Sequence, residues 1–181
     1  MQKRILASLL STALVAVLPL ASIAQTNETI KSGPEINEIS QSTTLLILAT
    51  SGNAIAGHGS GSLIAKNGDS GVGVTNRHVI DTDSTQDIEF VVRTADNELH
   101  PVSEIRAFPQ EDLAVVVFEC QQNYTPVSIA TYQLSPGQEV YISGWPADAG
   151  PGRFIRHFTS GSISTILDEP VEGYQVGYTN V

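Results

Sequence analysis

The chain has 181 residues, 41% of them hydrophobic, and its 9 basic and 19 acidic residues give a formal net charge of −10 at pH 7. This composition is that of an ordinary globular protein and excludes a collagen-like or low-complexity chain. The acidic excess and the lack of a basic cluster argue against nucleic acid as a partner, because such a surface repels phosphate backbones. The single cysteine excludes an intramolecular disulfide.

Residues 1–24 have the layout of a secretory signal peptide. A basic start at residues 1–4 is followed by an apolar stretch at 5–20 and by small residues at 22–24. An uncleaved membrane anchor is the alternative, since about 20 apolar residues can span a bilayer. Pro19 and the small residues favour cleavage after residue 24. We therefore expect a secreted or periplasmic protein that has no stable membrane association after cleavage.

Residues 25–42 are polar and have no sustained apolar period, so we interpret them as a leader into a folded part that begins near Thr43. Beyond this point, short runs of β-branched and aromatic residues alternate with turn formers, which predicts an all-β sandwich or barrel. No helix is expected after residue 24 except a single turn at 77–81. The predicted strands are residues 44–49, 61–65, 71–75, 88–93, 102–107, 113–118, 127–130, 139–143, 154–158, 162–167 and 174–178.

Two features before residue 80 could carry chemistry. Residues 57–62 read Gly-His-Gly-Ser-Gly-Ser, and glycines at a strand permit close approach by another backbone. This stretch therefore packs under another element or lines a cleft, unless its glycines only make a hairpin flexible. His78 follows a predicted strand, and a histidine there is either a structural residue or a general base, because imidazole exchanges protons near neutral pH.

Asp112 stands at the mouth of the apolar run 113–118, which we expect to be buried on both faces. An ionised carboxylate next to such an interior needs hydrogen bonds or an opposite charge. An imidazole N–H is a fitting partner, whereas Glu111 is interpreted as a solvated acid. A Ser-His-Asp site in this chain order would further require a serine beyond Asp112 in a glycine-rich turn.

Five segments together resemble the bacterial trypsin-like serine proteases with a chymotrypsin fold, including their HtrA-like branch. They contain a Gly-Ser-Gly strand, a Thr-Asn-x-His-Val motif, an Asp-Leu-Ala-Val motif and two segments similar to the start of the second barrel. They occur in one order at residues 59–64, 75–79, 112–115, 137–146 and 159–164.

The resemblance implies a chymotrypsin-like double Greek-key β-barrel, with a complete first barrel at 43–123 and an incomplete second barrel at 124–181. It also implies a serine-type endopeptidase that hydrolyses protein or peptide substrates through an acyl-enzyme. His78 would act as general base and then acid, and Asp112 as its orienting carboxylate. The family needs no cofactor.

The family's nucleophile is not present within this chain. Residues 174–181 resemble the strand that enters the nucleophile loop, but no Gly-x-Ser-Gly-Gly turn occurs in the 181 residues. Our hypothesis is a truncated form of a longer serine endopeptidase. One alternative is an inactive secreted pseudoprotease or peptide-binding module. Another is a carbohydrate-binding or adhesion β-domain, which predicts that His78 and Asp112 are not within hydrogen-bonding distance.

Metal sites are not predicted. Asp81, Asp83, Asp87 and Glu89 form a small acidic cluster, but Gln86 stands where an EF-hand loop needs glycine, so we interpret the cluster as a solvated loop. The other histidines lack companions at zinc-site spacing.

Overall fold

The computed structural model describes residues 30–81, 87–147, 152–171 and 174–180. The expected signal peptide at residues 1–24 lies outside them, as does Asp83 of the acidic cluster. Within the described ranges, no helix has the length and apolar character needed to cross a membrane.

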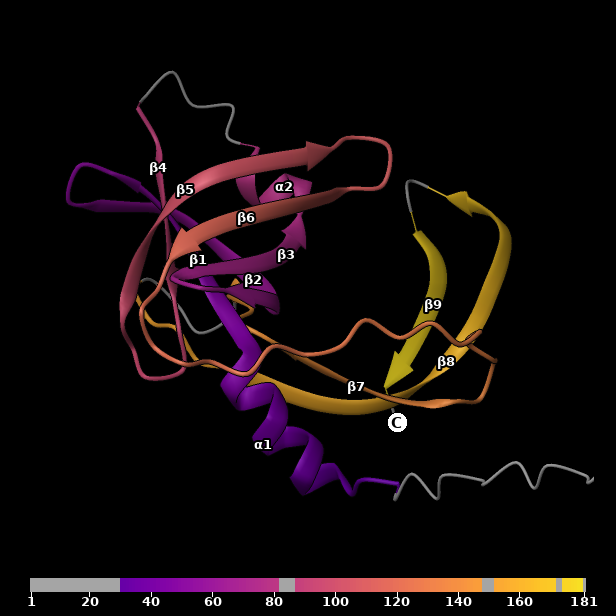
Figure 1. The fold of residues 1–181 in the computed structure, drawn as a ribbon. Helices are drawn as coiled ribbons and strands as arrows, with labels where there is room; N and C mark the ends of the chain where they lie inside the picture. Colours follow the sequence, from indigo (N-terminus) through magenta and orange to yellow (C-terminus); the bar gives the residue numbers. More distant parts are fainter. Residues whose placement is uncertain (1–29, 82–86, 148–151, 172–173, 181) are drawn as a thin grey trace, which may run out of the picture. The chain divides into compact units, whose positions relative to one another are not determined.

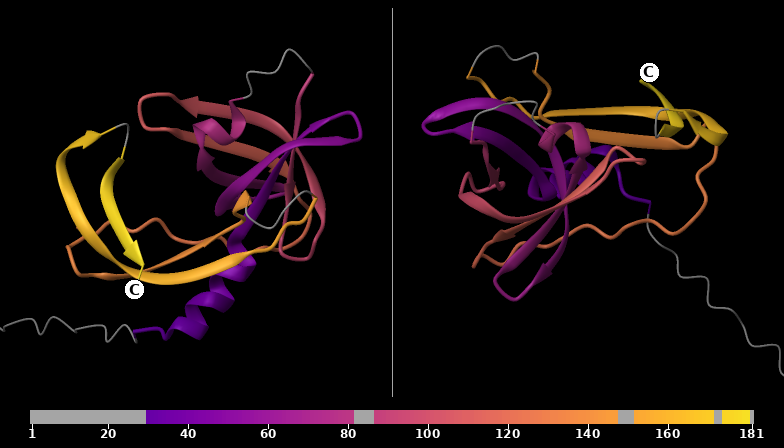
Figure 2. Two further views of the ribbon diagram at one scale, coloured as in Figure 1. Left: turned by 180° about the vertical axis from the view of Figure 1, so that it is seen from behind. Right: turned by 90° about the horizontal axis from the view of Figure 1, so that it is seen from above.

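Six antiparallel strands form a closed barrel in the order β1-β2-β3-β6-β5-β4 (Figures 1 and 2). The barrel closes because β1 pairs with both β2 and β4. A single helical turn, α2 (Arg77–Ile80), follows β3 as the sequence predicts. The strands are β1 (Thr44–Ser51), β2 (Ala54–Asn67), β3 (Ser70–Asn76), β4 (Glu89–Arg93), β5 (Leu99–Phe108) and β6 (Leu113–Glu119).

A second antiparallel sheet follows the barrel. Its strands are β7 (Glu139–Gly144), β8 (His157–Val171) and β9 (Tyr174–Asn180), in the order β7-β8-β9. In the described part of the chain this sheet is open. The predicted all-β, chymotrypsin-like architecture, with a complete first barrel and an incomplete second one, is therefore confirmed.

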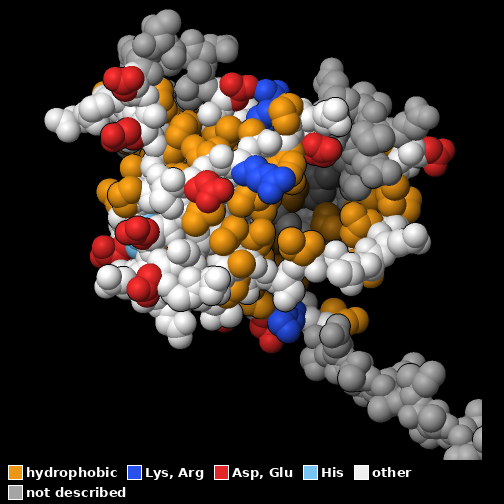
Figure 3. Space-filling model, turned by 45° about the horizontal axis from the view of Figure 1, so that its top comes forward, with side chains coloured by type: hydrophobic (Ala, Val, Ile, Leu, Met, Phe, Trp, Pro, Cys, Tyr) orange, Lys and Arg blue, Asp and Glu red, His pale blue; other side chains and the backbone are white. Residues whose placement is uncertain are grey.

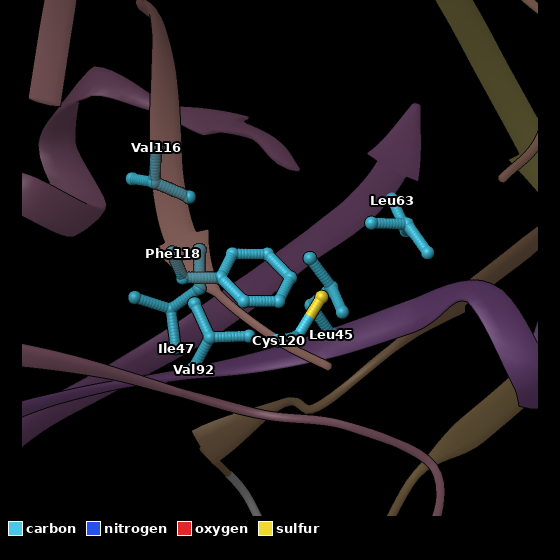
Figure 4. Close-up of a cluster of buried hydrophobic side chains, with 7 residues drawn as sticks. All are labelled: Leu45, Ile47, Leu63, Val92, Val116, Phe118 and Cys120. Carbon is cyan, nitrogen blue, oxygen red and sulfur yellow. The ribbon is translucent and has the colours of Figure 1, made fainter. Parts of the chain in front are cut away.

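Side chains from four strands and from the segment after β6 fill the barrel (Figure 4). On β6, Ala114, Val116 and Phe118 are fully buried, whereas the residues between them are only half-buried. The expectation that the apolar run 113–118 is buried on both faces is therefore wrong for the residues on its outer face. The strand buried on both faces is β1, whose residues 44–49 are all buried. The core consists of Leu45, Ile47, Leu63, Val92, Val116, Phe118 and Cys120.

The expected absence of a helix after residue 24 is wrong, because the second half of the polar leader lies in a helix, α1 (Gly33–Thr43). Ser32 and Glu35 make a capping box in which the Glu35 carboxylate accepts hydrogen bonds from both the backbone N–H and the hydroxyl of Ser32. Pro34 in the first turn has the fixed backbone angle that suits a helix start. These start signals were present in the sequence, but the helix lacks the wide apolar stripe by which helices are recognised.

Three predicted strands differ from the structure. The run at 127–130 is irregular and is tied to the barrel by the hydrogen bond from Val127 N–H to the Leu63 carbonyl. The runs at 154–158 and 162–167 are not separate strands, since β8 begins at His157 and continues through the second run. The glycine-dense stretch 57–62 lies inside β2.

Acidic side chains are spread over the face shown in Figure 3, and the basic side chains visible there lie beside acidic ones.

Candidate active site

The pairing of β3 with β6 brings the two predicted catalytic residues together. Asn76, the last residue of β3, is opposite Leu113, the first residue of β6. His78 lies on α2, which directly follows β3, and Asp112 directly precedes β6. Residues 34 positions apart in the sequence thus become neighbours at one end of the barrel.

His78 and Asp112 make two hydrogen bonds. The Nδ1 atom of His78 lies 2.8 Å from Oδ2 of Asp112, and the backbone N–H of His78 donates to Oδ1 at 3.0 Å. Because an ionised carboxylate only accepts hydrogen bonds, Nδ1 carries the proton in this pair. The side chain of His78 is 63% exposed and that of Asp112 is 14% exposed. Nε2 is then the ring nitrogen that can exchange a proton with a reacting group.

This contact overturns the prediction of the adhesion-domain alternative, which required the two side chains to be out of hydrogen-bonding range. A carboxylate that holds a histidine through Nδ1 fixes its tautomer and stabilises its cationic form. The arrangement can therefore serve as a general base and acid.

Asp112 adopts a backbone conformation that is rare for a residue with a side chain. Its φ is +45°, in the left-handed region, which costs a non-glycine residue about 1–2 kcal/mol. The carbonyl of Asp112 accepts hydrogen bonds from the backbone N–H of Arg77 at 3.0 Å and from Nδ2 of Asn76 at 3.2 Å. These bonds hold the strained residue in the conformation that directs its carboxylate toward His78.

A cleft of about 450 Å³ lies beside His78. Residues 57–60 of β2, within the glycine-dense stretch, line this cleft, so the prediction that the stretch lines a cleft is confirmed. Asp81 also borders the cleft, and its carboxylate pairs with Arg77 of the same helical turn. The lining residues are Ala49, Ala56, Gly57, His58, Gly59, Ser60, Asn76, His78, Val79, Asp81 and Ile88.

An aromatic cluster near the cleft was not anticipated from the sequence. The guanidinium of Arg93 lies 5.0 Å from the ring centre of Trp145 and 5.6 Å from that of Phe154, and burial lowers the pKa of Arg93. The ring of His58 packs edge-on against Phe154 with 5.0 Å between ring centres. His58 borders both the cleft and a second cavity of about 660 Å³ that Phe154 also lines. Nothing in the local sequence connects these four residues, which come from three separate segments.

Two serines, Ser60 at the cleft and Ser143 on β7, have structural hydrogen bonds. Ser60 borders the cleft, but its hydroxyl oxygen accepts the backbone N–H of Trp145 at 2.7 Å. The Ser143 hydroxyl lies 2.7 Å from that of Thr44 and accepts a hydrogen bond from Arg156. Neither serine stands in the glycine-rich turn that a nucleophile requires.

In the described residues, no group of three or more His, Cys, Asp or Glu side chains comes together in a way that could hold a metal ion. Asn76 is the functional candidate that sequence reasoning passed over, although it belongs to the Thr-Asn-x-His-Val motif. It lies beside the His78–Asp112 pair and donates to Oδ2 of Asp112 at 3.3 Å.

Comparison with known families agrees with this geometry. A search of curated proteins finds no match. The model of the trypsin-like peptidase domain matches residues 59–179, a span that includes most of the barrel, both residues of the His78–Asp112 pair and the second sheet. The chain therefore belongs to the trypsin-like peptidase domain family.

Proposed function

We propose that this domain is the histidine- and aspartate-bearing part of a serine endopeptidase of the HtrA-like branch. The observation that carries the proposal is the double hydrogen bond between His78 and Asp112 at the edge of an open cleft. Substrates are proteins or peptides, and no cofactor takes part. The signal-like segment at residues 1–24 supports a secreted or periplasmic location.

In the proposed reaction, His78 removes the proton of a serine hydroxyl through Nε2 while the serine oxygen attacks the carbonyl carbon of the scissile bond. Asp112 stabilises the imidazolium that forms. His78 then returns the proton to the amine as the C–N bond breaks, which leaves an acyl-enzyme that water hydrolyses by the same steps. The cleft beside His78 accommodates the substrate segment.

The serine and its oxyanion donors are proposed to follow Val181 in the complete protein. The 181 residues contain no Gly-x-Ser-Gly-Gly turn. In this family such a turn supplies both the nucleophile and backbone N–H groups, and loss of one such donor costs about 2.7–4 kcal/mol of transition-state stabilisation. Residues 1–181 by themselves are therefore expected to be inactive.

The test is to read the gene and its transcript past the codon for Val181 and to produce the protein encoded by the complete reading frame. We expect a Gly-x-Ser-Gly-Gly turn soon after Val181 and labelling of its serine by a fluorophosphonate probe. Replacing His78 by alanine should abolish this labelling, whereas replacing the exposed His157 should not. A reading frame that stops without the turn would overturn the endopeptidase and favour an inactive, peptide-binding pseudoprotease.

A further inference from the structure

Asn76 occupies the position of a helix cap without performing that role. It precedes α2 in an extended conformation, with φ −77° and ψ 148°, as an N-cap residue does. Asparagine at this position normally accepts a backbone N–H of the first helical turn with its side-chain oxygen. The side chain of Asn76 makes no such hydrogen bond. The usual structural reason for an asparagine before a helix is therefore absent.

The side-chain amide of Asn76 instead binds Asp112 at two points. Its Nδ2 atom donates to Oδ2 of the carboxylate at 3.3 Å and to the backbone carbonyl at 3.2 Å. Oδ2 is also the oxygen that lies 2.8 Å from Nδ1 of His78. The amide and the imidazole thus share one carboxylate oxygen, and rotation of the carboxylate would break both contacts.

Three consecutive residues together hold Asp112. Asn76 binds the carbonyl and the carboxylate through its side chain, Arg77 binds the carbonyl through its backbone N–H, and His78 binds both carboxylate oxygens. When the hydrogen bond of the His78 imidazole is set aside, the contacts of Asn76 are the only ones in this set that come from a side chain. Mutation can therefore remove the contacts of Asn76 without altering the backbone donors.

We propose that Asn76 is a positioning residue of the His78–Asp112 pair, which fixes the rotamer of the Asp112 carboxylate and supports its left-handed backbone. This inference rests on the proposed function for its catalytic consequence. Its structural content does not require a serine. Donation from a neutral amide favours the ionised form of a carboxylate without adding a competing charge. Asn76 thereby keeps Asp112 ready to hold the imidazole through Nδ1.

The experiment measures the low-field proton NMR signal of a histidine Nδ1–H that is donated to a carboxylate, in the protein encoded by the complete reading frame and labelled with ¹⁵N at histidine. We expect Asn76→Ala and the isosteric Asn76→Asp to weaken the His78 signal and to speed its exchange with water. Asn76→Ser, which retains a hydroxyl donor, should recover part of the signal. Asn67→Ala, at the exposed end of β2, is the matched control and should leave the signal unchanged.

Peptide hydrolysis by the same variants supplies a second measurement. Loss of the hydrogen bond from Asn76 to the Asp112 carboxylate, if that bond has ordinary strength, predicts that kcat falls about fivefold to tenfold in Asn76→Ala, with KM nearly unchanged. The backbone amide spectrum shows whether each variant is folded, and Asn76→Ser replaces the alanine variant in the comparison if the alanine variant does not fold.

An unchanged His78 signal in folded Asn76→Ala and Asn76→Asp would overturn the positioning role even if the protein is an active peptidase. A signal that responds to Asn76 in a protein without peptidase activity would support the positioning role while refuting the proposed function.

Discussion

Gly59 of β2 lies directly against Val79 of α2: a Cβ atom added to Gly59 would be 2.5 Å from Cγ1 of Val79. Because Val79 follows His78, this contact fixes the position of the helical turn that carries the imidazole. We expect Gly59→Ala to displace α2 and to lower the free energy of unfolding by about 1–3 kcal/mol, as overpacking usually does. Urea denaturation measures the stability, and the Nδ1–H signal of His78 reports the displacement.

Gly57→Ala is the matched control. A Cβ atom at Gly57 would lie 3.9 Å from Cβ of Ala49, which is an ordinary contact. Its stability should stay within about 0.5 kcal/mol of that of the original protein. If the two alanine variants have the same stability and the same His78 signal, the close packing of Gly59 against Val79 does not fix the position of α2.

The strain at Asp112 can be measured by comparing two replacements. Asp112→Ala and Asp112→Gly both remove the carboxylate, so both lose its hydrogen bonds to His78 and Asn76. Glycine adopts the φ of +45° without steric cost, whereas alanine adopts it only with strain. We expect the glycine variant to be more stable than the alanine variant by about 1 kcal/mol, after allowance for the greater entropy of glycine in the unfolded chain. A more stable alanine variant in urea denaturation would show that the backbone relaxes once the carboxylate is absent.

The His78–Asp112 pair could be predicted from the sequence because its signals are local. His78 follows a strand that ends at a recognisable motif, and Asp112 precedes an uninterrupted apolar run. The pairing of β3 with β6 then places the two side chains together without any further element. The same locality explains why each of the six barrel strands was located from the sequence: their apolar runs and bounding turns lie within a few residues.

The remaining features depend on contacts between distant segments. The side chain of Arg93 lies over Trp145 and Phe154, and no local pattern predicts such a pairing. Helix α1 is polar, and its hydrogen bonds with Arg156 join positions more than 110 residues apart. The two runs predicted as separate strands around Gly161 are one strand, because pairing with β7 and β9 continues β8 through that glycine. A glycine indicates a break only when no neighbouring strand enforces the extended backbone.

Arg156 connects α1 with β7. Its guanidinium donates to the Asn37 side-chain oxygen at 2.7 Å, to the Ser40 hydroxyl at 3.3 Å and to the Ser143 hydroxyl at 2.8 Å. We expect Arg156→Ala to reduce the free energy of unfolding by about 1–3 kcal/mol, because hydrogen bonds to a charged group are stronger than neutral ones. Hydrogen exchange at the backbone amides of α1 should become faster.

Arg153→Ala removes an exposed arginine three residues earlier and is the control for lost charge. It should change stability by no more than about 0.5 kcal/mol. Equal effects of the two arginine variants on α1 exchange would mean that net charge, and not the hydrogen bonds of Arg156, holds the helix.

Tyr124 should make the free energy of unfolding depend on pH in the alkaline range. Burial, followed by the hydrogen bond that its hydroxyl donates to Asp96 at 2.7 Å, raises the pKa of Tyr124 to about 12 from an ordinary value of 10. Since the folded protein holds this proton more tightly than the unfolded chain does, the resulting stabilisation is complete below pH 10 and is lost as the pH rises through 12.

Tyr124→Phe should therefore be less stable than the original protein at pH 8, and the difference should shrink between pH 10 and 12. Denaturant unfolding at each pH measures this difference, with Tyr132→Phe, a replacement at a residue that is 64% exposed, as the control. A difference between the original protein and Tyr124→Phe that stays constant across this range would show that the Tyr124 hydroxyl does not hold its proton more tightly in the folded state.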